Sequence, residues 1–526
     1  MPKKVVVVTG ASGSMGGEVI KSILLADKKN DRFKVVILLR KKHDNEELAI
    51  KLKRKYKGDI DIIFGDLSDF CDCEKIVKKA DYILHCAAII PPVSDHHPHL
   101  AESSNFGGTK NLIDAIHTAG RAEHVKFVEV GSVAEYGNRN YKHPWGRVGD
   151  PLIVSAYDFY AVTKLKAERY VIESGLKYWV SLRQSGILYD DILFHNLNDG
   201  LMFHTAWNTP IEWATARASG IMLRNLIEKD TDGTLPEKFW RNVYNIGNGP
   251  DARVTGFETV DRGFKMMGVS AKKIFRPNWN IARNFHCMWY YDSNILNDYL
   301  DFWVEGHEAF WKKLSKKLWY FKLGKPFPNL IRKFAIERLF KSNNSPKYWV
   351  KHNVEGRLQA FFGGVEAYNK IPDTWDNYGL LCENTLQDEA GNVVNYEELK
   401  DITKVKEKGL LLSHGYDETK PCEKIGLADC QQAAEFRGGK CLSTIMTEGD
   451  LYTKLKWEAH NGEVFHASPY LVLKAGHWAE STAPMPWNFG EMAKHMPFIA
   501  QVWYDSHTIE EKCYFSSECY KDIVTE

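Results

Sequence analysis

The chain has 526 residues, 44% hydrophobic and 26% charged, so it is an ordinary globular protein long enough for two or three domains. Its 69 Lys and Arg balance 68 Asp and Glu, which excludes a large net charge that would attract nucleic acid, so we expect no nucleic-acid partner. No run approaches the roughly 18 to 20 consecutive apolar residues of a membrane span. Ten scattered Cys, with no secretory pattern at the start, favour a cytoplasmic protein.

The first predicted element is a strand at residues 5–8, four valines that lead into a glycine turn and an amphipathic segment, residues 18–25. Strand, glycine turn and helix in this order are typical of a dinucleotide phosphate site. Gly10 permits the tight turn, Gly13 lets the backbone approach a pyrophosphate, and Gly16 allows close packing of helix on strand. The turn residues that we expect to contact the cofactor are Gly10, Ser12, Gly13, Met15 and Gly16.

A second strand is predicted at residues 34–39, and Arg40 follows it directly. An enzyme that selects a free ribose 2′-hydroxyl usually carries an acidic residue at this point, whereas a cation suits a 2′-phosphate. We therefore expect NADP(H) as the preferred cofactor and NAD(H) as the alternative. Arg40 would instead be a plain surface charge if it only begins the basic helix that contains Lys51 and Lys55.

Three further strands are predicted, at residues 60–64, 82–86 and 124–130, with a helical pattern over 105–119 before the last. Alternating strands and helices imply a parallel, doubly wound sheet, in which the ends of these strands lie along the cofactor edge. The residues at those ends are Asp66, Leu67, Ala87, Ala88 and Ser132.

Tyr160 and Lys164 are four residues apart, so on a helix the phenol and the ammonium would lie one above the other. A neighbouring ammonium favours phenolate over phenol, which lowers the pKa of the tyrosine and makes it a usable general acid or base. A solvated surface pair is the alternative, and spacing alone does not decide between them.

The order of these motifs makes the first 310 or so residues similar to the extended short-chain dehydrogenases/reductases, the epimerase/dehydratase-like superfamily. The resemblance implies an α/β fold, with a Rossmann-like doubly wound parallel sheet and a small substrate lobe, in an NAD(P)-dependent oxidoreductase. The motifs that carry it are Thr9-Gly10-x-x-Gly13-x-x-Gly16, Gly65-Asp66-Leu67, Ala87-Ala88, Asn105-x-x-Gly108-Thr109, Ser132-x-x-x-Tyr136-Gly137, Tyr160-x-x-x-Lys164, Leu182-Arg183 and Tyr244-Asn245-Ile246-Gly247-Asn248-Gly249.

The resemblance also implies roles for four residues. Ser132 would hold the substrate oxygen, Tyr160 would transfer its proton, and Lys164 would lower the pKa of Tyr160 and hold the nicotinamide ribose. Asn105 would support a water relay, and Asp66 with Leu67 would contact adenine. The structural alternatives are a strand-terminal turn for Ser132 and a helix N-cap for Asn105.

The predicted substrate lobe, mainly residues 185–300 of a domain spanning 1–315, departs from the family because its insertion is short. Aromatic residues around it would offer apolar walls, although they would equally serve as core. These are Trp207, Trp213, Trp240, Trp279, Trp289 and Tyr290. Four arginines are compatible with a diphosphate substrate, namely Arg217, Arg241, Arg253 and Arg276.

Residues 316–344 are expected to form a basic, aromatic linker helix. For the interleaved aromatic and basic residues at 318–341 we favour an amphipathic inter-domain helix over a membrane-surface anchor. An accessory region of α+β type would follow at 345–526. Its residues 436–485 resemble a small zinc-ribbon module that has lost its metal. The positions of the metal ligands are occupied by Ala459, Glu463, Ala479 and Thr482, which cannot form a structural zinc site, so we expect no metal.

The leading hypothesis is an NADP(H)-dependent oxidoreductase that reduces a carbonyl, or oxidises a secondary alcohol, on a small and largely apolar substrate such as a steroid-like ketone. The first alternative is a nucleotide-sugar epimerase or dehydratase with retained NAD. The second is a dinucleotide-sensing regulator without catalysis. The resemblance further implies a homodimer formed through two helices, one of which carries Tyr160.

Overall fold

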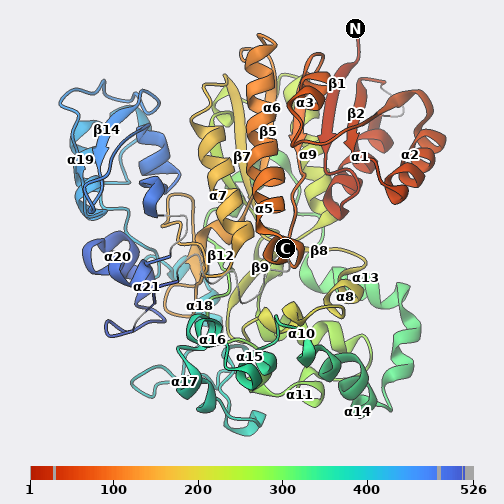
Figure 1. The fold of residues 1–526 in the computed structure, drawn as a ribbon, viewed down its shortest axis with the longest axis vertical. Coiled ribbons are helices and arrows are strands. Elements are labelled where there is room, and N and C mark those ends of the chain that lie inside the picture. Colours follow the sequence, from red (N-terminus) through yellow and green to blue (C-terminus); the bar gives the residue numbers. More distant parts are fainter. Residues whose placement is uncertain (1, 28–30, 483–486, 512, 516–526) are drawn as a thin grey trace.

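A parallel seven-stranded sheet forms the centre of the N-terminal half in this computed structural model, which describes residues 2–27, 31–482, 487–511 and 513–515 (Figure 1). The strand order is β10-β7-β5-β4-β1-β2-β3. This order confirms the predicted Rossmann-like fold. The strands are β1 (Lys4–Thr9), β2 (Phe33–Leu39), β3 (Ile60–Phe64), β4 (Tyr82–His85), β5 (Lys126–Ser132), β7 (Tyr178–Gln184) and β10 (Asn242–Ile246).

Helices cover both faces of this sheet because its strands are apolar on both sides. Val7 packs into the core on one face, whereas Val6 and Val8 pack into the core on the other. The first face is covered by α3 (Phe70–Val77), α6 (Gly107–Thr118) and α7 (Phe159–Ile172). The second is covered by α1 (Ser14–Ala26), α2 (His43–Tyr56), α9 (Ala216–Thr231) and α12 (Ser293–Leu300). Two short helices follow β4, α4 (Val93–His96) and α5 (Pro98–Ala101).

A smaller lobe lies below the strand ends, built on a second sheet (Figure 1). Its strands are β8 (Gly186–Leu188), β9 (Pro210–Thr215) and β11 (Arg253–Thr255), and β12 (Trp289–Tyr290) pairs with β6 (Trp145–Gly146). Its helices are α8 (Ile192–Asn196), α10 (Gly256–Lys265) and α11 (Ala271–Ile274). Trp207, Trp240, Trp279, Trp289 and Tyr290 are all buried. These aromatic side chains are therefore core, which removes the main support for an apolar substrate pocket.

The chain between 316 and 344 differs from the single helix expected of it. After α13 (His307–Lys317) it forms short helical turns, Trp319–Gly324, α14 (Pro328–Ile331), Arg332–Ile336 and Glu337–Lys341. Pro326 and Pro328 account for the break, because proline lacks a backbone donor and clashes with a preceding helical turn. No helix within the described residues has the length and apolar character needed to cross a bilayer.

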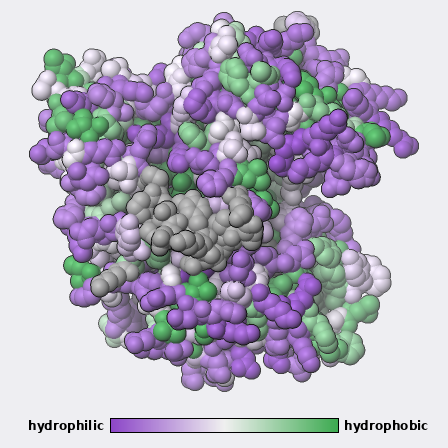
Figure 2. Space-filling model, viewed as in Figure 1, coloured by the Kyte–Doolittle hydropathy of each residue, from purple (hydrophilic) through white to green (hydrophobic). Residues whose placement is uncertain are grey.

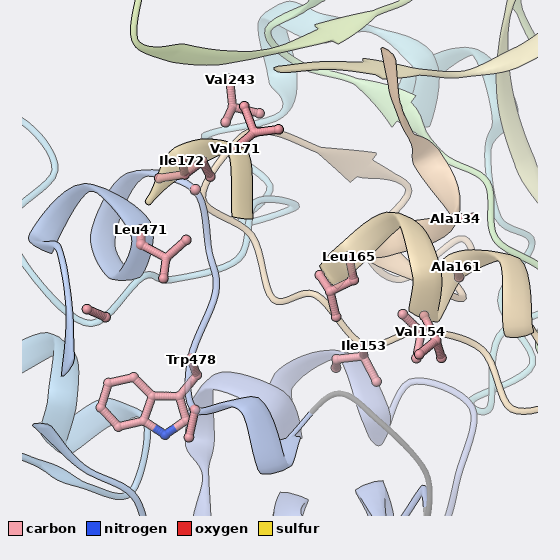
Figure 3. Close-up of a cluster of buried hydrophobic side chains, with 14 of the residues drawn as sticks. Ala134, Ile153, Val154, Ala161, Leu165, Val171, Ile172, Val243, Leu471 and Trp478 are labelled. Atoms are coloured by element: carbon pink, nitrogen blue, oxygen red, sulfur yellow. The ribbon is translucent and has the colours of Figure 1, made fainter. Parts of the chain in front are cut away.

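Residues 427–482 and 487–503 of the C-terminal region lie beside the Rossmann half and share a core with it, whereas residues 346–369 lie next to the small lobe (Figure 1). Figure 3 shows Leu471 and Trp478 across from Leu165 and Ile172 of α7. A dimer built through α7 would have to use another face of this helix, and the homodimer stays a prediction. The helices are α15 (Pro346–His352), α16 (Glu355–Phe362), α17 (Val365–Asn369), α18 (Tyr396–Lys400), α19 (Leu427–Phe436), α20 (Phe489–His495) and α21 (Pro497–Trp503).

A three-stranded antiparallel sheet lies within this region, formed by β13 (Lys440–Cys441), β14 (Leu455–Glu458) and β15 (Val464–Ala467). The turn at 459–463 and the turn at 479–482 lie side by side, since the amide of Asn461 donates to the hydroxyl of Ser481 at 3.2 Å. These are the two turns expected to hold the lost ligands. The likeness to a zinc ribbon stays a prediction.

Candidate active site

The glycine turn after β1 packs its backbone closely against the backbone of neighbouring segments. Gly10 has φ +70°, and a Cβ there would lie 2.8 Å from backbone atoms of Ala87. A Cβ on Gly16 would lie 2.2 Å from the carbonyl oxygen of Gly10. Only glycine fits either position, so the start of α1 packs directly on the turn and leaves backbone donors free to face a phosphate.

A cleft of about 180 Å³ opens beside this turn, between the ends of β1, β2, β3 and β4. Most of the predicted cofactor residues line it, namely Gly10, Ser12, Gly13, Arg40, Asp66, Leu67, Ala87 and Ala88. Met15 and Gly16 do not line the cleft, because Met15 is buried in the core beneath α1. The cleft and the glycine turn together fit a dinucleotide, with Arg40 exposed at the rim next to Asn45, whose amide donates to the Arg40 carbonyl.

His85 ties the cofactor turn to the helix behind it. Its Nδ1 lies 2.8 Å from the hydroxyl of Thr9, and its Nε2 lies 2.9 Å from the hydroxyl of Thr109. Thr109 already donates to the carbonyl of Asn105, so His85 donates through Nε2 and accepts through Nδ1. Burial, aided by the charge of Lys164, lowers the pKa of His85 to about 3. The imidazole is therefore neutral.

The catalytic tyrosine predicted from the sequence lies in the first turn of α7, which Asp158 caps by accepting from the backbone N–H of Ala161 at 2.9 Å. Ser132, at the end of β5, lies close to the Tyr160 hydroxyl. Burial raises the pKa of Tyr160 above its ordinary value, and the nearby Lys164 and Ser132 only partly offset this. The structure thus places Tyr160, Ser132 and Lys164 together, with Lys164 acting in the expected direction.

Lys164 has an unexpected partner, the carboxylate of Glu129 in β5. Its Nζ donates to Oε1 at 2.7 Å, and both side chains are buried. Burial alone would lower the pKa of Lys164, but the Glu129 carboxylate more than offsets it, so the pKa is raised. Lys164 is held as an ammonium ion one helical turn from Tyr160.

A chain of hydrogen bonds continues from Glu129. The register of β5 and β7 places Glu129 opposite Ser181, whose hydroxyl lies 2.8 Å from an oxygen of Glu129 and 2.8 Å from an oxygen of Glu168. Arg183 pairs with Glu168 through Nε at 3.0 Å and Nη2 at 2.5 Å. All four side chains are buried, so α7 and the sheet are joined by one polar network.

The network ends in the C-terminal region. His477 Nε2 lies 2.8 Å from Glu168, and Arg183 donates to the carbonyl of Ala475 at 2.7 Å. Despite burial, Arg183 and His477 hold the pKa of Glu168 below its ordinary value. Burial lowers the pKa of His477 itself, which faces Glu168 and Arg169 of α7 and Arg183 of β7. The C-terminal region is thus bonded directly to the helix that carries Tyr160.

Asn105 joins the loop after β4 to α7. Its amide accepts from the backbone N–H of Ile89 at 2.7 Å and donates to the Ile89 carbonyl and to Thr163. These contacts fix the loop after β4 against α7. The water relay implied by resemblance stays a prediction.

A second cavity of about 180 Å³ opens beside the N-terminus of α7. Its lining includes Asp158, which lies two positions before Tyr160 in the sequence. Its ionisable lining residues are Asp95, Asp158, His204, His286 and Arg357. Arg357 comes from α16 of the C-terminal region and lies over the ring of Tyr157. Two of the four arginines predicted to serve a diphosphate are engaged elsewhere, because Arg253 is buried against Glu212 and Arg241 lies over Tyr452.

Sequence reasoning missed three residues of this site, Glu129, Arg357 and His477. A signal existed for Glu129 alone, since it is a carboxylate inside an otherwise apolar strand. Arg357 and His477 reach the site through tertiary packing, so no local pattern indicated them.

Comparison with known proteins agrees with the motifs. The sequence model of the family described as "NAD dependent epimerase/dehydratase family" matches residues 6–185. Among solved structures, dTDP-glucose 4,6-dehydratase from Bacillus anthracis is similar at 15% identity and TM-score 0.45, over 60% of this chain and 96% of that one. UDP-glucuronic acid 4-epimerase from Bacillus cereus is similar at 19% identity and TM-score 0.46, over 60% and 99%.

Proposed function

We propose that the chain is an NAD(P)-dependent enzyme of the epimerase/dehydratase type, which moves hydride to and from a hydroxyl-bearing carbon of a polar, sugar-like substrate. The observation that carries the proposal is that Ser132 and Lys164 both lie close enough to Tyr160 to act on its pKa, inside the segment that the family model matches. Ser132 thus supplies a third group beside Tyr160 and Lys164, as acid–base chemistry at a hydroxyl requires.

Each side chain has a task in this proposal. Tyr160 accepts the proton of the substrate hydroxyl when the carbon is oxidised and returns it on reduction, while Ser132 holds the same oxygen. Lys164 favours the phenolate and opposes the effect of burial on Tyr160. A nicotinamide, when bound, supplies the acceptor and donor of hydride. Proton transfer of this kind contributes roughly 10²- to 10⁴-fold to the rate.

The glycine turn and the cleft beside it would hold the dinucleotide. Gly10 and Gly13 would offer backbone to the pyrophosphate, and Asp66 with Leu67 would lie against adenine. Arg40 at the rim supports NADP(H) as the preferred cofactor, since a guanidinium pairs well with a 2′-phosphate. NAD(H) is the alternative, and it is the cofactor in the name of the matching family.

The cavity near Tyr160 has a mixed lining, in which carboxyl groups, imidazoles and Arg357 lie beside apolar side chains, so it offers partners to a substrate that carries polar groups. Arg357 would suit an anionic group such as a phosphate or carboxylate. The reading as a reductase of apolar ketones has less support, since the aromatic residues that suggested it are core. A cofactor-binding regulator is the remaining alternative.

The test begins with the dinucleotide that purifies with the full chain, identified after acid extraction. A retained dinucleotide, NADP or NAD, would support the epimerase/dehydratase type, and exchangeable NADPH would support a reductase. Turnover is then assayed with a panel of nucleoside diphosphate sugars. Tyr160→Phe should bind dinucleotide normally and lose at least about 100-fold in turnover.

Tyr170→Phe is the matched control, because Tyr170 lies on the same helix but bonds to Asp114. It should leave turnover unchanged. Full activity in Tyr160→Phe would overturn the mechanism, and tight cofactor binding with no turnover on any substrate would favour the regulator.

A further inference from the structure

Large apolar side chains are exposed along the segment that follows α13. Six of them lie between residues 319 and 334, where globular proteins normally expose such residues singly. Figure 2 shows hydrophobic residues gathered at the lower right, where α13 and α14 lie in Figure 1. They are Trp319 (66% exposed), Tyr320 (44%), Leu323 (71%), Phe327 (53%), Leu330 (51%) and Phe334 (65%).

The same segment is strongly basic. Residues 312–341 contain ten Lys and Arg against one Glu, in a chain whose net charge is +1. Lys317 is paired with Asp190, but among the described side chains none forms an ion pair with the exposed Lys322, Lys325 or Lys333. The apolar patch is therefore flanked by three lysines whose charge no described side chain neutralises.

We propose that residues 319–334 bind the surface of a membrane that contains anionic lipids. The aromatic and aliphatic side chains would enter the boundary between headgroups and acyl chains, and the lysines would contact acidic headgroups. Both properties of the segment are needed for this partner. Nucleic acid would pair with the lysines but would leave Leu323 and Leu330 without an apolar partner. A second copy of the chain would place its own positive charges against those of the segment.

The geometry fits a peripheral contact. Pro326 and Pro328 divide the segment into single turns, and its C-terminal end is fixed to the lobe by the buried side chains of Ile336 and Leu339. Phe321 packs edge-on against Phe194, with ring centroids 5.7 Å apart. A membrane bound at this segment would thus lie beside the small lobe that follows β8.

The experiment uses the full chain and large unilamellar vesicles. Co-flotation is expected with vesicles of phosphatidylcholine containing roughly one-third phosphatidylserine, weakening as salt is raised, and none with phosphatidylcholine alone. Trp319→Ser with Phe334→Ser, and separately the triple exchange of Lys322, Lys325 and Lys333 for Gln, should each weaken binding at least about tenfold. These positions are exposed, so the fold should survive, which thermal unfolding checks.

Matched controls come from other exposed sites. Ile445→Ser removes a side chain that is 83% exposed, and exchange of Lys51, Lys53 and Lys55 of α2 for Gln removes three charges. Neither should change flotation. Absence of flotation at low salt, or equal loss in the controls, would overturn the proposal. A dimer seen by sedimentation that Trp319→Ser with Phe334→Ser dissociates would show that a second copy covers the patch instead.

Discussion

Lys164 of α7 and Glu129 of β5 form a buried ion pair whose nitrogen and oxygen lie 2.7 Å apart. A carboxylate beside Lys164 offsets its effect on Tyr160. Ser181 links this pair to Glu168, because its hydroxyl lies 2.8 Å from an oxygen of Glu129 and 2.8 Å from an oxygen of Glu168. The hydroxyl has one proton to donate, so how it is shared between the two carboxylates sets how strongly Glu129 offsets the charge of Lys164.

His477→Leu is therefore expected to raise the pKa of Tyr160. His477 donates to Glu168, which leaves the Ser181 hydroxyl to donate to Glu129. Without His477 the hydroxyl would turn to Glu168, and Glu129, having lost this donor, would offset more of the charge of Lys164. We therefore expect the pKa of Tyr160 to rise. The measurement is ¹⁹F NMR of 3-fluorotyrosine placed at position 160 of the full chain, compared with and without the substitution.

Two further variants separate this effect from a general loosening of the site. His477→Gln keeps a donor toward Glu168 and should retain the wild-type pKa of Tyr160. In a Glu129→Gln background there is no carboxylate to neutralise Lys164, so adding His477→Leu should change nothing. If His477→Leu changed the pKa of Tyr160 equally with and without the Glu129 carboxylate, this coupling would be contradicted. The titration requires neither substrate nor cofactor.

Gly16→Ala is expected to abolish tight dinucleotide binding. Its Cβ would lie 2.2 Å from the carbonyl oxygen of Gly10, so the turn has to open and the backbone donors move away from the pyrophosphate. Calorimetric titration with NAD⁺ and NADP⁺ should show affinity reduced about 100-fold. Gly17→Ala is the matched control, since its Cβ would meet only the carbonyl oxygen of Ala11, at 3.8 Å. Equal losses in both variants would show that the close approach at Gly16 is not the cause.

Arg40→Ser is expected to weaken NADP⁺ and leave NAD⁺ unaffected. A charge-assisted hydrogen bond to a 2′-phosphate contributes about 1.5 to 3 kcal/mol, which corresponds to roughly 10- to 100-fold in affinity. Lys41→Ser provides the control, because Lys41 is exposed next to Arg40 but does not line the cleft. If both dinucleotides lose affinity equally, Arg40 supports the cleft without selecting the cofactor.

The sequence was sufficient where the decisive neighbours are close along the chain. The glycine turn follows its strand directly, and Tyr160 and Lys164 share a helix face by spacing alone. The contact of Glu129 with Lys164 depends instead on how α7 packs over β5. His477 is 309 residues from Glu168, so the contact exists only because the C-terminal region folds back on α7.

The aromatic residues of the lobe show where the sequence was not sufficient. Their composition fitted a pocket wall and a core equally well, and only packing distinguished the two. Trp207 and Trp289 bury their rings and bond their indole N–H groups to the carbonyls of Pro277 and Val254. The exposed aromatics at 319–334 lie in a segment whose composition favoured an amphipathic inter-domain helix.

His85 gives a prediction about stability and pH. In the unfolded chain a histidine titrates near pH 6.5, whereas burial between Thr9 and Thr109 lowers the pKa of His85 to about 3. Between these values the unfolded chain binds a proton that the folded chain does not. The free energy of unfolding should therefore fall as pH decreases below about 6.5, by ~1.4 kcal/mol per pH unit from this group.

His85→Gln removes this titration while keeping an amide that can bond both threonines. Urea unfolding at pH 7 and pH 5 should show a pH-dependent loss smaller by about 2 kcal/mol in His85→Gln than in the unsubstituted chain. His43→Gln is the control, because the side chain of His43 is 83% exposed and its exchange should leave the pH dependence unaltered. An unchanged slope in His85→Gln would mean that His85 is protonated in the folded chain, and that the Thr9 turn is held by a charged imidazole.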